Sequence, residues 1–171
     1  MAIEPAHFDM IAAWSQAGLR DGAGKLPHVL VFGAGHTGRA LATALAPLPL
    51  MARLIDTRAD ACAGYNAPVE ATITPLPEAE VRAAPPGGAF VAMTHDHALD
   101  FLVAAAALAR GDAAYVGMIG SATKRAKFAG YARTCCDGLE VSGLTCPIGA
   151  GAPGDKRPEV IAVMVAAEVT G

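Results

Sequence analysis

The sequence contains few aromatic residues and few charges. Phe, Trp and Tyr make up only 5% of its 171 residues, 17% are charged, and the net charge is −3. A slightly acidic chain is not expected to bind nucleic acid or an anionic membrane surface through its charge. The chain is 53% apolar and rich in alanine, which favours one compact domain with helices packed closely against a sheet.

Long apolar runs are also missing. The longest one, FLVAAAALA from Phe101, has nine residues, whereas a membrane-spanning helix needs about 20. The N-terminus carries Glu4 and Asp9 and lacks the basic start and apolar core of a signal peptide. We therefore expect a cytoplasmic protein without a membrane segment.

Cysteine is scarce, and its spacing excludes two classes of small domain. The four cysteines are Cys62, Cys135, Cys136 and Cys146. None of them forms a C-x-x-C pair, and adjacent cysteines have poor geometry for bridging each other. Neither a disulfide framework nor a structural zinc site is expected, and at least three of the four should be buried or half-buried.

From residue 28 onward, short apolar runs alternate with helix-like stretches that glycine or proline ends. Expected strands cover 28–33, 50–56, 69–73, 89–94 and 113–120, and expected helices cover 7–17, 37–46, 77–84, 97–110, 121–133 and the chain from about 158. Residues 143–158 are rich in glycine and proline and are expected to form a loop. The alternation predicts a three-layer α/β, Rossmann-like fold, with a mostly parallel sheet of order 3-2-1-4-5 and helices on both faces. This domain is expected over 27–171, with residues 1–26 as an N-terminal extension and linker.

The stretch VFGAGHTGRALATAL contains a glycine pattern typical of phosphate-binding loops. Gly33, Gly35 and Gly38 fit G-x-G-x-x-G between an expected strand and an expected helix. The first glycine permits the tight turn, the second lets a pyrophosphate approach the backbone, and the third lets the helix pack against the sheet. The start of the helix, with His36 and Thr37, offers free N–H groups to an anion. His36 either donates a hydrogen bond to the ligand or is a solvated loop residue.

An acidic residue follows at the spacing that a ribose-binding loop requires. Asp56 ends the second expected strand and is a candidate to bind the ribose hydroxyls of a nucleotide. Arg58, two residues further on, could instead contact a 2′-phosphate. Because Asp56 favours an unphosphorylated ribose, a nucleotide of the NAD type is preferred to NADP.

Two further stretches follow neighbouring strands. In THDHALD, Thr94, His95 and His97 are candidate ligand contacts, although Thr94 or Asp96 could simply cap the next helix. Two histidines with no assignable third ligand are weak evidence for a metal ion, and no metal site is predicted.

The second stretch, GMIGSATKRAKF, contains Gly120, Ser121 and Lys124, with Ser121 well placed as a helix N-cap. The helix dipole disfavours a lysine in the first turn, so its position favours an anion bound there. An exposed basic face is the alternative. On the anion hypothesis, removal of Lys124 should leave the ligand-free protein unchanged or slightly more stable, and should weaken anion binding. All three stretches point to one crevice that binds a phosphate-bearing ligand.

Taken in order, these motifs resemble a known family. VLVFGAGHTGRALA, MTHDHALD, ALARGDAAYVGMIGSATKRAKF and CPIG…PEVIAVMVAAE are similar to the C-terminal domain of the xanthine dehydrogenase accessory proteins of the XdhC/CoxI type, over residues 28–169. The resemblance implies that the protein binds molybdenum cofactor (molybdopterin), protects it, assists its sulfuration, and inserts it into a xanthine-dehydrogenase-type molybdoenzyme. It also implies no turnover reaction of its own and a sulfurtransferase as a further partner. A dimer is expected only because dimers are the commonest protein assemblies.

Several alternatives remain open. Longer members of the family carry a separate N-terminal domain, and 27 residues before the first expected strand are too few to form it. Either a partner chain supplies that domain, or the short form holds only a nucleotide. The chain could otherwise be an NAD(P)-dependent oxidoreductase, or a nucleotide-sensing module without catalysis.

Overall fold

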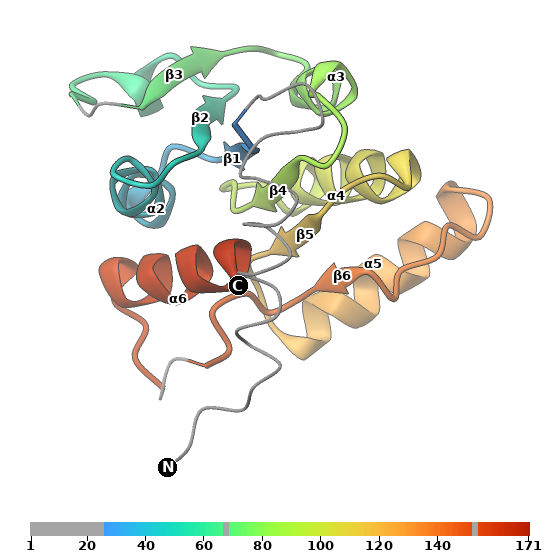
Figure 1. The fold of residues 1–171 in the computed structure, drawn as a ribbon. Coiled ribbons are helices and arrows are strands. Elements are labelled where there is room, and N and C mark those ends of the chain that lie inside the picture. The colour runs from blue at the N-terminus through green and yellow to red at the C-terminus, as the bar shows by residue number, and fades with distance from the viewer. Residues whose placement is uncertain (1–25, 67–68, 152–153) are drawn as a thin grey trace.

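The computed structural model describes residues 26–66, 69–151 and 154–171, and these form a parallel six-stranded sheet covered by helices on both faces (Figure 1). The strands are β1 (His28–Phe32), β2 (Met51–Asp56), β3 (Glu70–Ile73), β4 (Ala89–Ala92), β5 (Tyr115–Met118) and β6 (Leu144–Thr145). Their order is β3-β2-β1-β4-β5-β6, and every neighbouring pair is parallel. The predicted fold class and the order 3-2-1-4-5 are confirmed. The helix expected over 7–17 lies outside the described residues.

The sixth strand was not predicted. Leu144 pairs with Val116 of β5, in the middle of the glycine- and proline-rich segment that was expected to be a loop. Two residues are too short to give an apolar alternation, so the sequence pattern carries no signal for this strand. Its effect is to extend the sheet beyond β5 on the side of helix α5.

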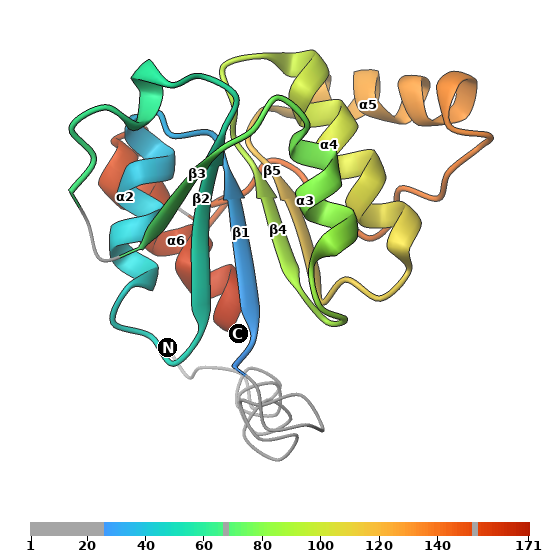
Figure 2. The ribbon, with the colours of Figure 1, turned by 90° about the horizontal axis from the view of Figure 1, so that it is seen from above.

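The helices divide between the two faces as the alternation of strand side chains requires (Figure 2). One face is covered by α2 (His36–Leu45) and α6 (Pro158–Thr170), and the other by α3 (Pro77–Ala83), α4 (His97–Arg110) and α5 (Ala122–Cys135). In β1, Val29 and Val31 join the core under α2 and α6, whereas Leu30 and Phe32 join the core under α3, α4 and α5. Both faces of the central strand are therefore buried, which explains why it has a continuous apolar sequence.

The ends of the helices follow local rules. Asp96 caps α4 by accepting a hydrogen bond from the Ala98 amide at 2.8 Å, and Gly111 ends it with a φ of 70°. Ser121 caps α5 as predicted, because its Oγ accepts from the Lys124 amide at 3.3 Å. Pro158 occupies the first turn of α6. Helices α4 and α5 begin at the carboxyl edge of the sheet, because each directly follows the end of a parallel strand.

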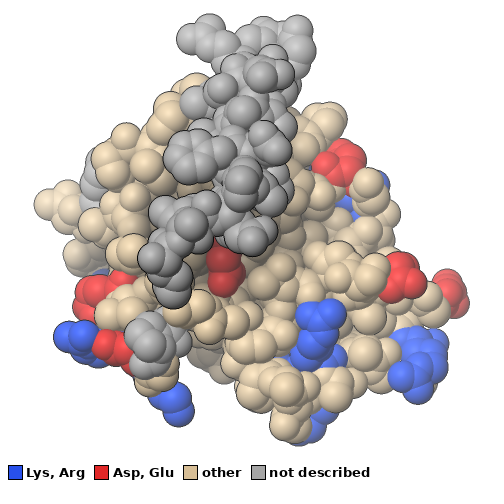
Figure 3. Space-filling model, turned by 60° about the horizontal axis from the view of Figure 1, so that its bottom comes forward, with Lys and Arg blue, Asp and Glu red and all other residues tan. Residues whose placement is uncertain are grey.

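The described part of the chain has no helix long and apolar enough to cross a membrane. On the face that Figure 3 shows, most of the described surface is uncharged, and basic and acidic side chains are scattered over it without forming a continuous area of either kind. The charge on this face is therefore mixed. All four cysteines are free: Cys146 is buried, Cys62 and Cys136 are half-buried, and Cys135 is exposed.

Candidate functional site

The three predicted stretches meet at the carboxyl edge of the sheet, because they follow three adjacent parallel strands. The glycine loop follows β1, residues 93–96 follow β4, and residues 119–121 follow β5. The Met93 amide donates to the Phe32 carbonyl, and the Ile119 amide donates to the Ala92 carbonyl, each at 2.8 Å. The chain leaves β1 toward β2 on one side while β4 lies on the other, which is where doubly wound folds bind ligands.

The three glycines of the loop differ in what surrounds them. Gly33 has a φ of +113°, and a Cβ there would lie 2.3 Å from the Met93 carbonyl oxygen. A Cβ on Gly38 would lie 1.8 Å from the Gly33 carbonyl oxygen. A Cβ on Gly35 would meet no atom within 4 Å. Gly33 and Gly38 are thus required by the fold itself, whereas the open side of Gly35 leaves room for a ligand.

Helix α2 begins without a side-chain cap. Gly35 occupies the N-cap position and has no side chain to accept from the first amides. His36 is exposed and Thr37 is half-buried at this end of the helix. The uncapped first turn can therefore offer its N–H groups to an anion.

Asp56 is buried and fixes the glycine loop. Its Oδ2 accepts from the Ala34 amide at 2.7 Å, and its Oδ1 accepts from the Arg58 amide at 2.9 Å. The Arg58 guanidinium adds hydrogen bonds to both oxygens, at 3.2 and 3.3 Å. The carboxylate predicted to accept ribose hydroxyls is thus already bonded to the loop backbone and to Arg58.

These contacts give Asp56 a testable pH dependence. Burial raises the pKa of the carboxyl, but hydrogen bonds from Arg58 and the Ala34 amide outweigh burial and hold the pKa below its ordinary value of 3.8. A lowered pKa stabilises the fold above about pH 4, and this contribution is lost as pH falls through the folded-state value. Wild type should therefore melt above Asp56→Asn at pH 7, and the difference should shrink toward pH 3. A difference independent of pH would contradict this.

Arg39 also supports the loop and was not predicted. Its Nε donates to the Ala34 carbonyl at 2.9 Å, and its Nη2 donates to the carbonyls of Ala61 and Ala63. Its guanidinium lies over the Tyr65 ring, 5.9 Å from the centroid. Arg39 thus ties the glycine loop to the segment after β2. An arginine at the start of a helix gives no sequence signal for such contacts, since its partners are backbone carbonyls.

The loop after β4 exposes both of its histidines. The Thr94 hydroxyl donates to the Asp96 carbonyl at 2.8 Å, so this side chain is used within the loop. His95 and His97 are exposed beside it. Among the described residues, no group of three His, Cys, Asp or Glu side chains is arranged to hold a metal ion.

The loops after β4 and β5 are joined by a buried ion pair that the sequence did not predict. Asp100 is 0% exposed and Lys124 is 7% exposed, and Lys124 Nζ lies 2.5 Å from Asp100 Oδ2. Lys124 Nζ also donates to the Ile119 carbonyl at 2.8 Å, and Asp100 Oδ1 accepts from the Thr94 amide at 2.8 Å. The network therefore spans from the end of β4 to the end of β5.

This arrangement corrects the interpretation of Lys124. We expected its ammonium group to face a bound anion at an unfavourable helix end, so that its loss would be neutral or stabilising without ligand. The structure turns the side chain inward onto Asp100, which accounts for a lysine in the first turn of α5. Loss of the Lys124 ammonium would leave the buried Asp100 carboxylate unpaired. We therefore expect removal of Lys124 to destabilise the ligand-free protein, not to leave it unchanged or stabilise it. Gly120 and Ser121 remain exposed at the edge of the sheet.

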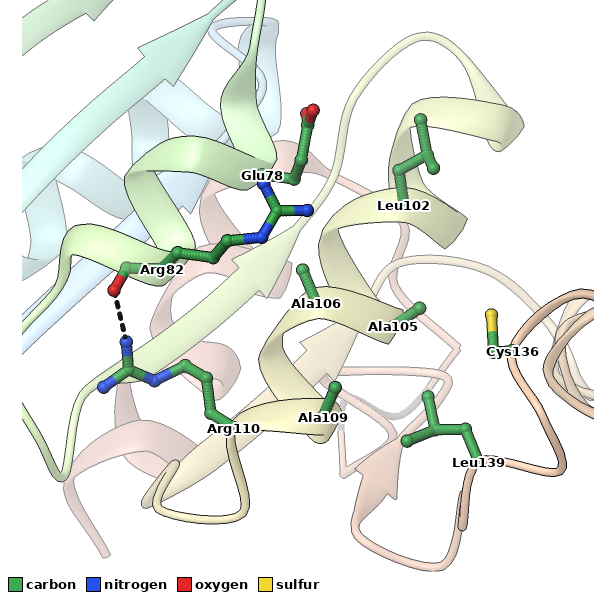
Figure 4. A pocket seen from close by; sticks show the side chains of 9 residues that line it. All are labelled: Glu78, Arg82, Leu102, Ala105, Ala106, Ala109, Arg110, Cys136 and Leu139. Atoms are coloured by element: carbon green, nitrogen blue, oxygen red, sulfur yellow. Dashed lines mark hydrogen bonds between the residues drawn. The ribbon is translucent and has the colours of Figure 1, made fainter.

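Two hollows in the surface differ in how they lie relative to the candidate site. One, of about 440 Å³, lies against α4 and contains none of the predicted site residues (Figure 4). Figure 4 shows alanines of α4 along it, with Cys136 and Leu139 on the opposite wall. The other, of about 560 Å³, lies between α2, α6 and residues 64–66, and His36 and Arg39 line it. Only the second adjoins the glycine loop.

Comparison with known proteins agrees with the fold and the motifs. The family model described as the XdhC Rossmann domain matches residues 29–169. No curated protein matches the chain. A crystal structure described as a xanthine dehydrogenase from Bacillus halodurans superposes with a TM-score of 0.71 at 21% identity, covering 85% of this chain and 42% of that one.

At 21% identity, the likeness to the Bacillus halodurans protein shows the fold alone, and the chain spans less than half of that neighbour's length. The family match carries more weight, because it extends from β1 into α6 and includes all three loops of the candidate site. The chain therefore belongs to the XdhC Rossmann domain family.

Proposed function

We propose that this domain is an accessory factor that binds molybdenum cofactor at the glycine loop and passes it to a xanthine-dehydrogenase-type molybdoenzyme. The observation that carries the proposal is a family match over residues 29–169 that includes a glycine loop with an open side at Gly35. A sulfurtransferase that modifies the cofactor is a further partner in this proposal, and a dimer is the proposed assembly.

The residues at this edge fit such a group. The cofactor carries a phosphate monoester, and the uncapped amides at the start of α2 match its charge. His36, His95 and His97 are exposed nearby and can donate hydrogen bonds to phosphate or to a polar ring. When bound, the cofactor supplies the redox chemistry of the recipient enzyme, and the domain holds and orients it.

The environment of Asp56 favours a pterin phosphate over a dinucleotide. Both carboxylate oxygens already accept hydrogen bonds from Ala34 and Arg58. A ribose diol could bind there only by displacing the Arg58 guanidinium, which would cost a charge-assisted hydrogen bond. A ligand that places only its phosphate on the loop leaves the hydrogen bonds between Arg58 and Asp56 intact. This argument replaces the preference for an NAD-type nucleotide that the Asp56 spacing alone favoured.

Replacement of Gly35 with valine tests the site. The side chain would enter the open side of the loop, where a Cβ meets no atom within 4 Å. We expect Gly35→Val to melt within a few degrees of wild type and to bind molybdenum cofactor at least tenfold more weakly. Binding is measured by titration with cofactor released from a purified molybdoenzyme, followed by pterin fluorescence.

The matched control is Gly130→Val. Gly130 lies within α5, and a Cβ there also meets nothing within 4 Å. This variant should bind the cofactor as wild type does. Equal affinity in wild type and a folded Gly35→Val protein would remove the glycine loop from the binding site.

A further inference from the structure

The proposed function makes no use of the buried pair of Asp100 and Lys124, although the pair is bonded to two loops of the candidate site. Asp100 is in the first turn of α4, and Lys124 is in the first turn of α5. Their side chains are 0% and 8% exposed, so a bound anion cannot replace either partner without opening the protein. The pair must therefore act on the site through other groups.

Those groups are backbone atoms of the two loops. Asp100 Oδ1 accepts from the Thr94 amide, directly after β4, and Lys124 Nζ donates to the Ile119 carbonyl, directly after β5. Gly120 packs on the same lysine, because a Cβ there would lie 2.5 Å from Lys124 Cδ. The ion pair thus fixes where both loops leave the sheet.

Asp56 is used in a similar way on the neighbouring loop. It is buried, pairs with a basic side chain, and accepts from the Ala34 amide of the glycine loop. Two buried carboxylates, each with its own basic partner, therefore fix all three loops of the candidate site. A buried ion pair is often no more stabilising than apolar residues of the same volume. The stability of the fold alone therefore does not explain why a buried carboxylate with a basic partner occurs at both places.

We propose that Asp100 and Lys124 are positioning residues that hold the β4–α4 and β5–α5 loops in one arrangement, and that ligand binding depends on it. The dependence on ligand rests on the proposed function. The exposed residues His95, His97 and Gly120 lie next to the two backbone groups that the pair binds, which are the Thr94 amide and the Ile119 carbonyl.

The test separates positioning from stability. In Asp100→Leu/Lys124→Met, two apolar side chains of similar shape replace the pair, so no buried charge is left unpaired. We expect this double variant to recover most of the melting temperature that Lys124→Met loses. Its Thr94 amide should exchange hydrogen at least tenfold faster than in wild type, and its affinity for molybdenum cofactor should fall at least tenfold.

A double variant with wild-type exchange at Thr94 and wild-type affinity would overturn the positioning role. Hydrogen exchange needs no ligand, so it decides whether the pair holds the loops even if wild type fails to bind the cofactor. That failure would instead overturn the proposed function and the dependence on ligand.

Should the double variant not fold, Asp100→Asn takes its place. Its amide oxygen can still accept from Thr94, but the charge partner of Lys124 is gone. We then expect protection to persist at Thr94 and to fall at Ile119, whose amide is bonded to Ala92. Unchanged protection at both amides would overturn the proposal.

Discussion

Replacing Lys124 with methionine is expected to lower the free energy of unfolding by about 3–5 kcal/mol, the cost of removing one partner from a buried ion pair. Methionine fills a similar volume, so little of the loss would come from a cavity. The carboxylate of Asp100, which is 0% exposed, would lose its ammonium partner, and the Ile119 carbonyl would lose a donor. Urea denaturation monitored by circular dichroism measures the change.

Lys127→Met is the control, because Lys127 is an exposed lysine on the same helix. Its loss should change stability by no more than about 0.5 kcal/mol, as is usual for surface positions. A Lys124→Met protein as stable as wild type would mean that the ammonium faces solvent, as the helix-dipole argument from the sequence assumed.

Replacing Gly38 with alanine is expected to cost about 3 kcal/mol or more, at the upper end of the range for overpacked sites. The new methyl group would lie 1.8 Å from the Gly33 carbonyl oxygen, which is backbone and cannot rotate away. Gly33 itself is held by a 2.7 Å hydrogen bond from its amide to the Ile55 carbonyl. Relief would require α2 to move away from the sheet, which would open the core around Leu41 and Leu45.

Gly35→Ala, three residues earlier, is the matched comparison. Its methyl group meets no atom within 4 Å, and its φ of −70° suits alanine. Thermal denaturation should therefore show a large fall for Gly38→Ala and little change for Gly35→Ala. Similar melting temperatures in the two variants would show that α2 packs less closely on β1 than described.

Most of the fold could be predicted because it follows from local patterns. A buried parallel strand requires a continuous apolar run, and HVLVF supplies one that the structure buries on both faces. Helix α4 has the predicted bounds because Asp96 and Gly111 mark its two ends. Strand β6 was missed because two residues that pair with β5 leave no periodic trace.

The location of the candidate site could also be predicted, but the direction of its side chains could not. The glycine spacing and strand order bring the three loops to one edge. Whether Lys124 faces solvent or Asp100 depends on a contact across 24 positions of sequence, which no local pattern encodes. Asp56 stands where the spacing requires it, yet its oxygens are directed to Ala34 and Arg58.

A comparison of the affinities for two ligands tests the central claim most directly. Wild-type protein is titrated with molybdenum cofactor released from a molybdoenzyme, and separately with NAD, with inorganic phosphate as a control for the anion alone. Saturable binding of the cofactor, at least tenfold tighter than NAD and weakened in Gly35→Val, is the predicted result. Tight binding of NAD with no binding of the cofactor would contradict the account, and would mean that Arg58 yields its place on Asp56 to a ribose.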